Sequence, residues 1–282
     1  MRLHPGLVTD TRRAAPYALL LALGLGAVVV AGAHYSNAFP SEKAPFGWPG
    51  PSSFEHAVAM VRSDLILAAS LPALALGAFA LRGREPAREG VGGALRTYGV
   101  HAAMLAVAVL VAGILGAIGA AKAPFDAVFA FWTAHTVLAL AFYSIAFAWS
   151  CWLKEHALAG AAAMWIGFLG LYESVTRTIL FRQVGYERLA AGDFPTWFWA
   201  AQGLSPLSSY TGILILWREK FRDYTETAVL ANAALPSWLV PATFVALATM
   251  LWILLPLSIG LAGWWWRART WSAARVTRAE PA

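Results

Sequence analysis

Six apolar runs, each long enough to cross a lipid bilayer, constrain this chain more than any other feature of its sequence. They occupy residues 14–33, 63–82, 98–121, 127–153, 157–181 and 238–266. A transmembrane helix needs about 20 consecutive, mainly apolar residues, and its backbone polar groups must bond within the segment. Only 13% of the 282 residues are charged, whereas a soluble domain carries about 25%. We therefore expect a single domain, an all-α integral membrane protein with six transmembrane helices and an outer segment at residues 182–237.

The placement of the basic residues predicts the orientation. With both termini in the cytoplasm, the inner loops hold 12 Lys/Arg and 5 Asp/Glu and the outer loops 9 and 10, so the net charge of +6 divides into +7 inside and −1 outside. Inner loops of membrane proteins carry the excess of Lys and Arg. We expect a multi-pass protein of the cell (plasma or inner) membrane with both termini cytoplasmic. Because the basic residues gather at the ends of apolar runs, we expect no nucleic-acid partner.

The first apolar run admits two interpretations. Its 19-residue apolar core suits a retained spanning helix, and Ala31-Gly32-Ala33 at its end is typical of a signal-peptide cleavage site. The length of the run favours the retained helix.

A charged, glycine-rich segment at residues 82–97 separates the second and third runs and is longer than a turn between antiparallel helices requires. The charged residues of interest in it are Arg84, Glu85, Arg88 and Glu89, and the glycines that follow are Gly90, Gly92 and Gly93. The charged residues fit a short helix along the membrane surface, and the glycines would let the chain turn back into the third span. The alternative is a solvated loop that only reflects the bias towards inner positive charge.

The order of these features resembles the ABC-2-type transporter permeases, and most closely their NosY-like branch. The matching parts are Phe54-Glu55, Arg84-Glu85, Gly92-Gly93-Ala94-Leu95, Tyr98, spans three to five, and Leu204-Ser-Pro-Leu-Ser-Ser-Tyr210 ahead of the last span. The resemblance implies an ABC-2 (type V exporter-like) permease fold, a homodimer surrounded by membrane lipid, and two copies of a separate ABC ATPase subunit. Family members begin with a basic amphipathic helix, whereas here only residues 1–13 precede the first span.

In permeases of this family, the loop after the second span is a coupling helix seated on the ATPase. The resemblance therefore assigns coupling to Arg84, Glu85, Arg88 and Glu89. No Gly-x-x-x-x-Gly-Lys-Ser/Thr phosphate loop occurs in the sequence. ATP and Mg²⁺ would accordingly bind on the partner subunit. We expect a transport subunit of the exporter kind, not an enzyme, with no catalytic residue and no cofactor or metal of its own.

Two charged residues interrupt the fifth apolar run. Glu173 and Arg177 lie four residues apart near its outer end, a spacing that permits a salt bridge on one helix face. Charged residues at this depth are functional candidates unless paired or in contact with water. The pair is a candidate outer gate or, alternatively, an ion pair that closes the helix at the membrane interface.

The outer segment contains a second helical pattern at residues 205–226. Ser205 suits the N-cap and Pro206 the first turn, and apolar residues recur at three- and four-residue steps from Tyr210. The pattern predicts an amphipathic helix in the outer interface that caps the transport path. The alternative is a helix packed on the bundle for stability alone.

Two histidines raise a different class of function, a membrane-embedded subunit that binds haem or quinone. His101 and His135 lie in the third and fourth spans, and haem iron takes histidine ligands. Their positions put them over about 10 Å apart along the membrane normal, whereas two ligands of one haem need similar depth. Polar residues satisfied within the bundle are the favoured interpretation. An assembly or anchoring protein without a transport path is a third hypothesis.

Overall fold

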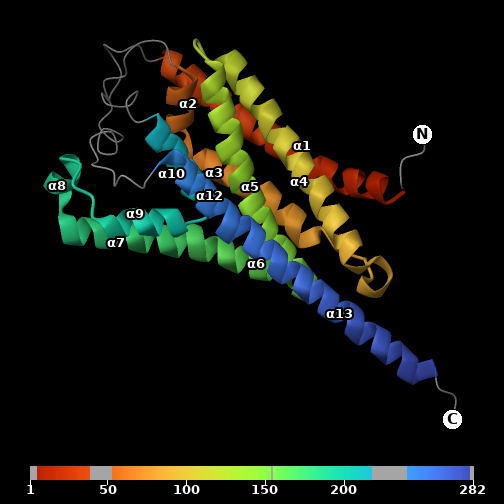
Figure 1. The fold of residues 1–282 in the computed structure, drawn as a ribbon. Coiled ribbons are helices and arrows are strands. Elements are labelled where there is room, and N and C mark those ends of the chain that lie inside the picture. The colour runs from red at the N-terminus through yellow and green to blue at the C-terminus, as the bar shows by residue number, and fades with distance from the viewer. Residues whose placement is uncertain (1–4, 39–52, 154, 218–239, 280–282) are drawn as a thin grey trace.

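The computed structural model describes residues 5–38, 53–153, 155–217 and 240–279, and its secondary structure is helical (Figure 1). Within these ranges it has one isolated β-bridge, between Ser53 and Lys122, and no strand. The first four spans are α1 (Pro5–Ala38), α3 (Arg62–Phe79), α4 (Pro86–Gly119) and α5 (Phe125–Leu153), and the short helix α2 (Phe54–Met60) precedes α3. The remainder are α6 (Ala157–Ile166), η1 (Gly167–Tyr172), α7 (Glu173–Val184), α8 (Tyr186–Ala190), α9 (Thr196–Leu204), α10 (Ser208–Leu216), α12 (Pro241–Ala248), η3 (Thr249–Leu254) and α13 (Leu255–Ala279).

Six helical rods are long and apolar enough to cross a membrane. They are α1, α3, α4, α5, the continuous rod α6–η1–α7, and the continuous rod α12–η3–α13. The expected all-α class and the six spans of a multi-pass membrane protein are confirmed.

Several helices run beyond the apolar runs that predicted them. The third span begins at Pro86 rather than at 98, and α1 begins at Pro5 rather than at 14. Hydropathy marks only the part of a helix that lies in lipid, whereas backbone hydrogen bonding continues through polar residues. Twelve of the 16 residues of the charged segment, 86–97, therefore form the first part of α4, and the connection between α3 and α4 is short.

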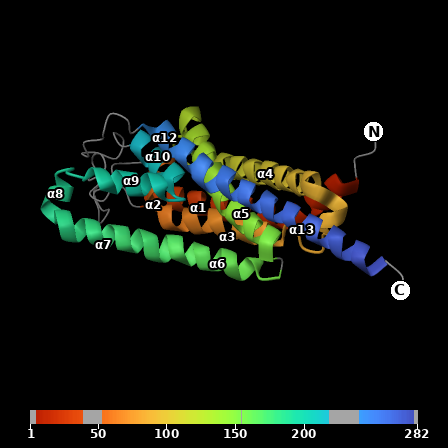
Figure 2. The same ribbon diagram turned by 60° about the horizontal axis from the view of Figure 1, so that its bottom comes forward.

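Both termini lie at the same end of the bundle as the start of α4 (Figures 1 and 2). We call this the proximal end, and we call the opposite end, which carries α2 and α8 to α10, the distal end. Rods that alternate in direction from one end to the other produce this arrangement when their number is even. The geometry agrees with the inference that both termini are on one side.

The centre of the bundle is formed by α1, α3, α4 and α5. In α5, 61% of the residues in the most apolar stretch are buried, among them Phe142, Tyr143 and Phe147. A methyl group added at Gly77 of α3 would lie 2.4 Å from the Tyr143 carbonyl oxygen. Glycine at this position therefore permits the backbones of α3 and α5 to meet.

The fifth and sixth rods lie at the edge of this centre, and each contains a π-helical turn. Their most apolar stretches are only 11% and 22% buried, respectively. The two π-helical turns meet where Phe168 of η1 packs edge-on against Trp252 of η3, with ring centroids 4.5 Å apart. π-helical turns are uncommon and frequently mark functional sites.

The distal helix α10 is buried on almost every side. Ser208, Ser209, Tyr210 and Ile213 are all buried, so its first two turns have no solvent-facing side. Over Ser208–Leu216 the predicted helix is present and is packed on the bundle. Ser205 is the C-cap of α9, and its hydroxyl accepts a hydrogen bond from the Leu207 N–H at 3.1 Å. The second half of the predicted helix, residues 218–226, lies outside the described residues.

Candidate functional site

The charged segment folds as a turn followed by a kinked helix start. Gly83 takes a positive φ of 75°, Glu85 caps α4, and Pro86 occupies its first turn. Gly90 then breaks the helical geometry with φ 60° and ψ −171°. An L side chain is disfavoured at this backbone conformation. One charged helical turn, residues 86–89, is therefore set at an angle to the spanning part of α4.

The four residues predicted to couple the protein to an ATPase divide into two pairs. Arg84 is buried and forms ion pairs with Asp10 and with Glu89. Arg88 and Glu85 point outwards, with side chains 75% and 42% exposed, and pair with each other at 3.1 Å. Arg84 precedes α4, so it does not share a helix face with Arg88 as a short charged helix over the four residues would require. Of these four residues, Arg88 and Glu85 therefore present the most exposed charge to a partner.

Asp10 of α1 is the residue that sequence reasoning missed. Its carboxylate is fully buried and pairs with Arg84, and it also receives Arg96 Nε and Thr97 Oγ1, each at 3.4 Å. An isolated carboxylate would be costly here, but it is stable when paired and hydrogen-bonded. The sequence did contain an indication of its role, because Asp10 is the only acidic residue in residues 1–13, a segment that also contains three arginines. Asp10 thus anchors the charged segment to the start of α1.

The last helix holds the kink from the other side. The indole N–H of Trp264 in α13 donates to the Gly90 carbonyl at 2.9 Å, and Trp264 itself is buried. Arg13 of α1 donates to the Arg82 carbonyl at 3.0 Å. The turn that carries the exposed Arg88–Glu85 pair is therefore held by contacts with α1 and α13 and is part of α4. A force on this pair would reach three helices.

The distal pair of the sequence prediction is arranged differently from the expected salt bridge. Glu173 is buried, and its Oε1 accepts a hydrogen bond from Ser205 Oγ at 2.8 Å. Arg177 is exposed and, among the described residues, forms no ion pair with Glu173. Both residues line one cavity of about 270 Å³ together with Arg62. The cavity lies between the start of α3 and the junction of η1 with α7.

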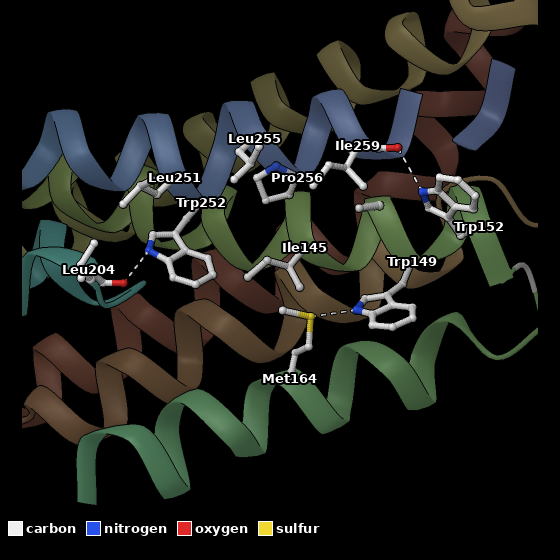
Figure 3. Close-up of a pocket in the computed structure, with 11 residues that line it drawn as sticks. Ile145, Trp149, Trp152, Met164, Leu204, Leu251, Trp252, Leu255, Pro256 and Ile259 are labelled. Atoms are coloured by element: carbon white, nitrogen blue, oxygen red, sulfur yellow. Dashed lines mark hydrogen bonds between the residues drawn. The ribbon is translucent and has the colours of Figure 1, made fainter. Parts of the chain in front are cut away.

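A larger cavity of about 550 Å³ lies between α5, α6 and the sixth rod (Figure 3). Three tryptophans border it, and each indole N–H is already bonded: Trp149 to Met164 Sδ, Trp152 to the Ile259 carbonyl, and Trp252 to the Leu204 carbonyl. The cavity therefore presents apolar surface and no free indole donor. Chemically, it suits an apolar group.

The two histidines occupy separate places. His101 Nδ1 lies 3.1 Å from the Tyr143 hydroxyl, and His135 Nδ1 lies 2.9 Å from the Phe131 carbonyl. Because Tyr143 is eight residues from His135 along α5, the two sites are about 12 Å apart along the helix. In the described part of the chain, no group of three or more His, Cys, Asp or Glu side chains is placed to hold a metal ion. The two imidazoles are too far apart to be axial ligands of one haem.

Comparisons of the chain with protein-family models, with curated proteins and with solved structures find no significant match.

Proposed function

We propose that this protein is the membrane-spanning permease subunit of an ATP-driven transporter of the ABC-2 type, working as an exporter. Two copies would form the translocation path, and two copies of a separate ATPase would supply the energy at the proximal end. The protein would lie in the plasma or inner membrane, and its proximal end would face the cytoplasm.

The observation that carries the proposal is that the exposed Arg88–Glu85 pair is connected to the spanning helices through buried contacts. A coupling element needs an exposed surface that a partner recognises and a stiff connection to the moving helices. The pair is exposed, whereas the residues beneath it form buried ion pairs. Trp264 connects the same turn to α13. A solvated loop that only satisfied the bias in charge would need none of these contacts.

The two lateral rods support the proposal that part of the bundle moves. They have little buried surface, each has a π-helical turn, and they face each other through Phe168 and Trp252. Loosely covered helices with irregular hydrogen bonding can shift at lower cost than the packed centre. Their uncovered apolar surface also provides room for a second copy or for lipid.

The test is ATP hydrolysis by a reconstituted complex. The permease is co-expressed with a candidate ABC ATPase subunit, purified in detergent, and returned to lipid vesicles. We expect the permease to change the ATPase rate several-fold, and we expect Glu85→Lys or Arg88→Glu to remove this change. Rim charges that steer docking typically alter association without unfolding either partner.

The matched control is an exposed ion pair at the distal end. Arg188 and Asp193 have side chains 69% and 51% exposed, and Arg188→Glu should leave the ATPase rate unchanged. If both charge reversals at the proximal end retain full stimulation, the proposed coupling role is wrong. If the purified permease never associates with an ATPase, the transporter proposal itself fails.

A further inference from the structure

The cavity between α3 and the η1–α7 junction has polar groups at one end and apolar groups at the other. Arg62 of α3 and Glu173 and Arg177 of α7 line its distal part. One helical turn closer to the middle of the bundle, the lining changes to Ile66 and Leu67. At about 270 Å³, the cavity is close to the roughly 300 Å³ at which small-molecule sites begin.

Glu173 lines this cavity and has a carboxylate oxygen without a hydrogen-bond partner. Its side chain is only 7% exposed, and Oε1 is bonded to Ser205. Oε2 is buried and has no hydrogen-bond partner in the described structure. An unpartnered buried carboxylate oxygen is unfavourable, and a cation that donates a hydrogen bond would relieve it. The cavity therefore has a place for an ammonium group.

The two arginines have unused donors. Arg62 is held over the ring of the buried Tyr210, 5.5 Å from its centroid, and this contact leaves its N–H groups unoccupied. Among the described residues, no carboxylate or carbonyl oxygen accepts a hydrogen bond from Arg62 or from Arg177. Guanidinium groups with free donors fit phosphate oxygens well. The cavity therefore has a place for a phosphate close to the place for an ammonium.

The apolar end continues as an exposed track along α3. Leu67 and Leu71, four residues apart on one helix face, are 40% and 48% exposed. Near this level the indole N–H of Trp165 in α6 donates to Ser70 Oγ at 2.9 Å, which joins the two helices beneath the cavity. The helix face of Leu67 and Leu71 leads towards the middle of the spanning region, where acyl chains lie.

We infer that this cavity binds a phospholipid with a phosphoethanolamine headgroup. The phosphate diester contacts Arg62 and Arg177, the primary ammonium donates to Glu173 Oε2, and an acyl chain follows Leu67 and Leu71. The carboxylate selects a primary ammonium over a choline, because a quaternary ammonium has no N–H to donate. This inference does not depend on the proposed transport function.

Native mass spectrometry of the purified permease tests the inference directly. The protein in mild detergent is offered equal amounts of phosphatidylethanolamine, phosphatidylcholine and phosphatidylglycerol with identical acyl chains. We expect about tenfold or more preference for phosphatidylethanolamine, consistent with one charged hydrogen bond made or lost. Glu173→Gln should remove the preference, and Arg62→Gln or Arg177→Gln should lower the binding of phosphatidylethanolamine about tenfold.

Matched controls come from the same part of the chain. Arg182 at the end of α7 and Glu187 of α8 are exposed and do not line the cavity, so Arg182→Gln and Glu187→Gln should bind lipid as the parent does. If Glu173→Gln does not fold, the Arg177→Gln comparison carries the test, because Arg177 is exposed.

Three results would overturn the inference. One is equal retention of the three lipids, and a second is a preference that survives both Glu173→Gln and Arg177→Gln. The third is displacement of the lipid by soluble glycerophosphoethanolamine at the same concentration, which would show that a free headgroup compound is the ligand and that the acyl track contributes nothing.

Discussion

Asp10 and Arg84 form a buried ion pair that joins the first helix to the turn before α4, across 74 residues of sequence. The Arg84 side chain is 6% exposed and that of Asp10 is not exposed at all. Removing one member of such a pair leaves an uncompensated buried charge, whereas an exposed pair contributes little. The position of the charged segment therefore depends on a residue that lies in another part of the sequence.

Asp10→Ala should lower the free energy of unfolding by about 3 kcal/mol, because Arg84 and Arg96 would lose their shared carboxylate. Denaturation in mixed detergent micelles, followed by circular dichroism, measures the change. Glu85→Ala is the control, and it should cost less than about 1 kcal/mol because its pair with Arg88 is exposed. An equal loss of unfolding free energy in the two variants would show that the buried pair stabilises the protein no more than the exposed pair does.

Arg88→Cys should react with a membrane-impermeant maleimide from the cytoplasmic side only. The experiment is clean because the single native cysteine, Cys151, is buried. Arg188→Cys, at the distal end, should react from the opposite side only. Labelling is measured on right-side-out and inverted vesicles by the shift in mass of the protein. Reaction of Arg88→Cys from the outside would reverse the orientation and remove access of any cytoplasmic ATPase.

Trp264→Phe removes the indole N–H that bonds to the Gly90 carbonyl while retaining the aromatic ring. We expect a stability loss of about 1 kcal/mol and a clear decrease in ATPase stimulation, with little change in affinity for the ATPase. The affinity is measured by titration of the ATPase and the stimulation at saturation. The control is Trp152→Phe, whose indole bonds to Ile259 away from the charged segment. Unchanged stimulation in Trp264→Phe would mean that α13 does not receive the force.

Gly77→Ala should destabilise the contact between α3 and α5 by about 1–3 kcal/mol, because the added methyl group would meet the Tyr143 backbone oxygen at 2.4 Å. Gly99→Ala in α4 is the matched substitution, since nothing lies within 4 Å of its added methyl group. It should be neutral or stabilise the helix by up to about 1 kcal/mol. Thermal unfolding in detergent compares the two, and a smaller loss for Gly77→Ala than for Gly99→Ala would contradict this packing.

The optical spectrum of the purified protein should show no haem absorption. His101 is directed to Tyr143, and His135 stacks on Phe131 with ring centroids 4.0 Å apart. His135→Phe should retain this aromatic contact and remain folded. A Soret band that disappeared in His135→Phe or in His101→Phe would revive the hypothesis of a redox subunit.

Much of the architecture could be predicted from the chain alone. The number of spans followed from the length and polarity of continuous runs, and these are local properties because each transmembrane helix satisfies its own backbone. The helix starts at Pro5 and Pro86 were missed because hydropathy marks only the part of a helix that lies in the membrane, not the whole helix. The charged segment and the unusual position of Glu173 were also visible locally.

What only the tertiary structure decided was which charges face each other. The sequence could not distinguish Arg84, which is buried against Asp10, from Arg88, which is exposed, because both are arginines in one short segment. It offered Arg177 as the partner of Glu173, whereas the fold supplies Ser205. The spans could be recognised from apolar residues that are neighbours in the chain. The ion pairs were determined by helices that become neighbours only when the bundle packs, and so required the structure.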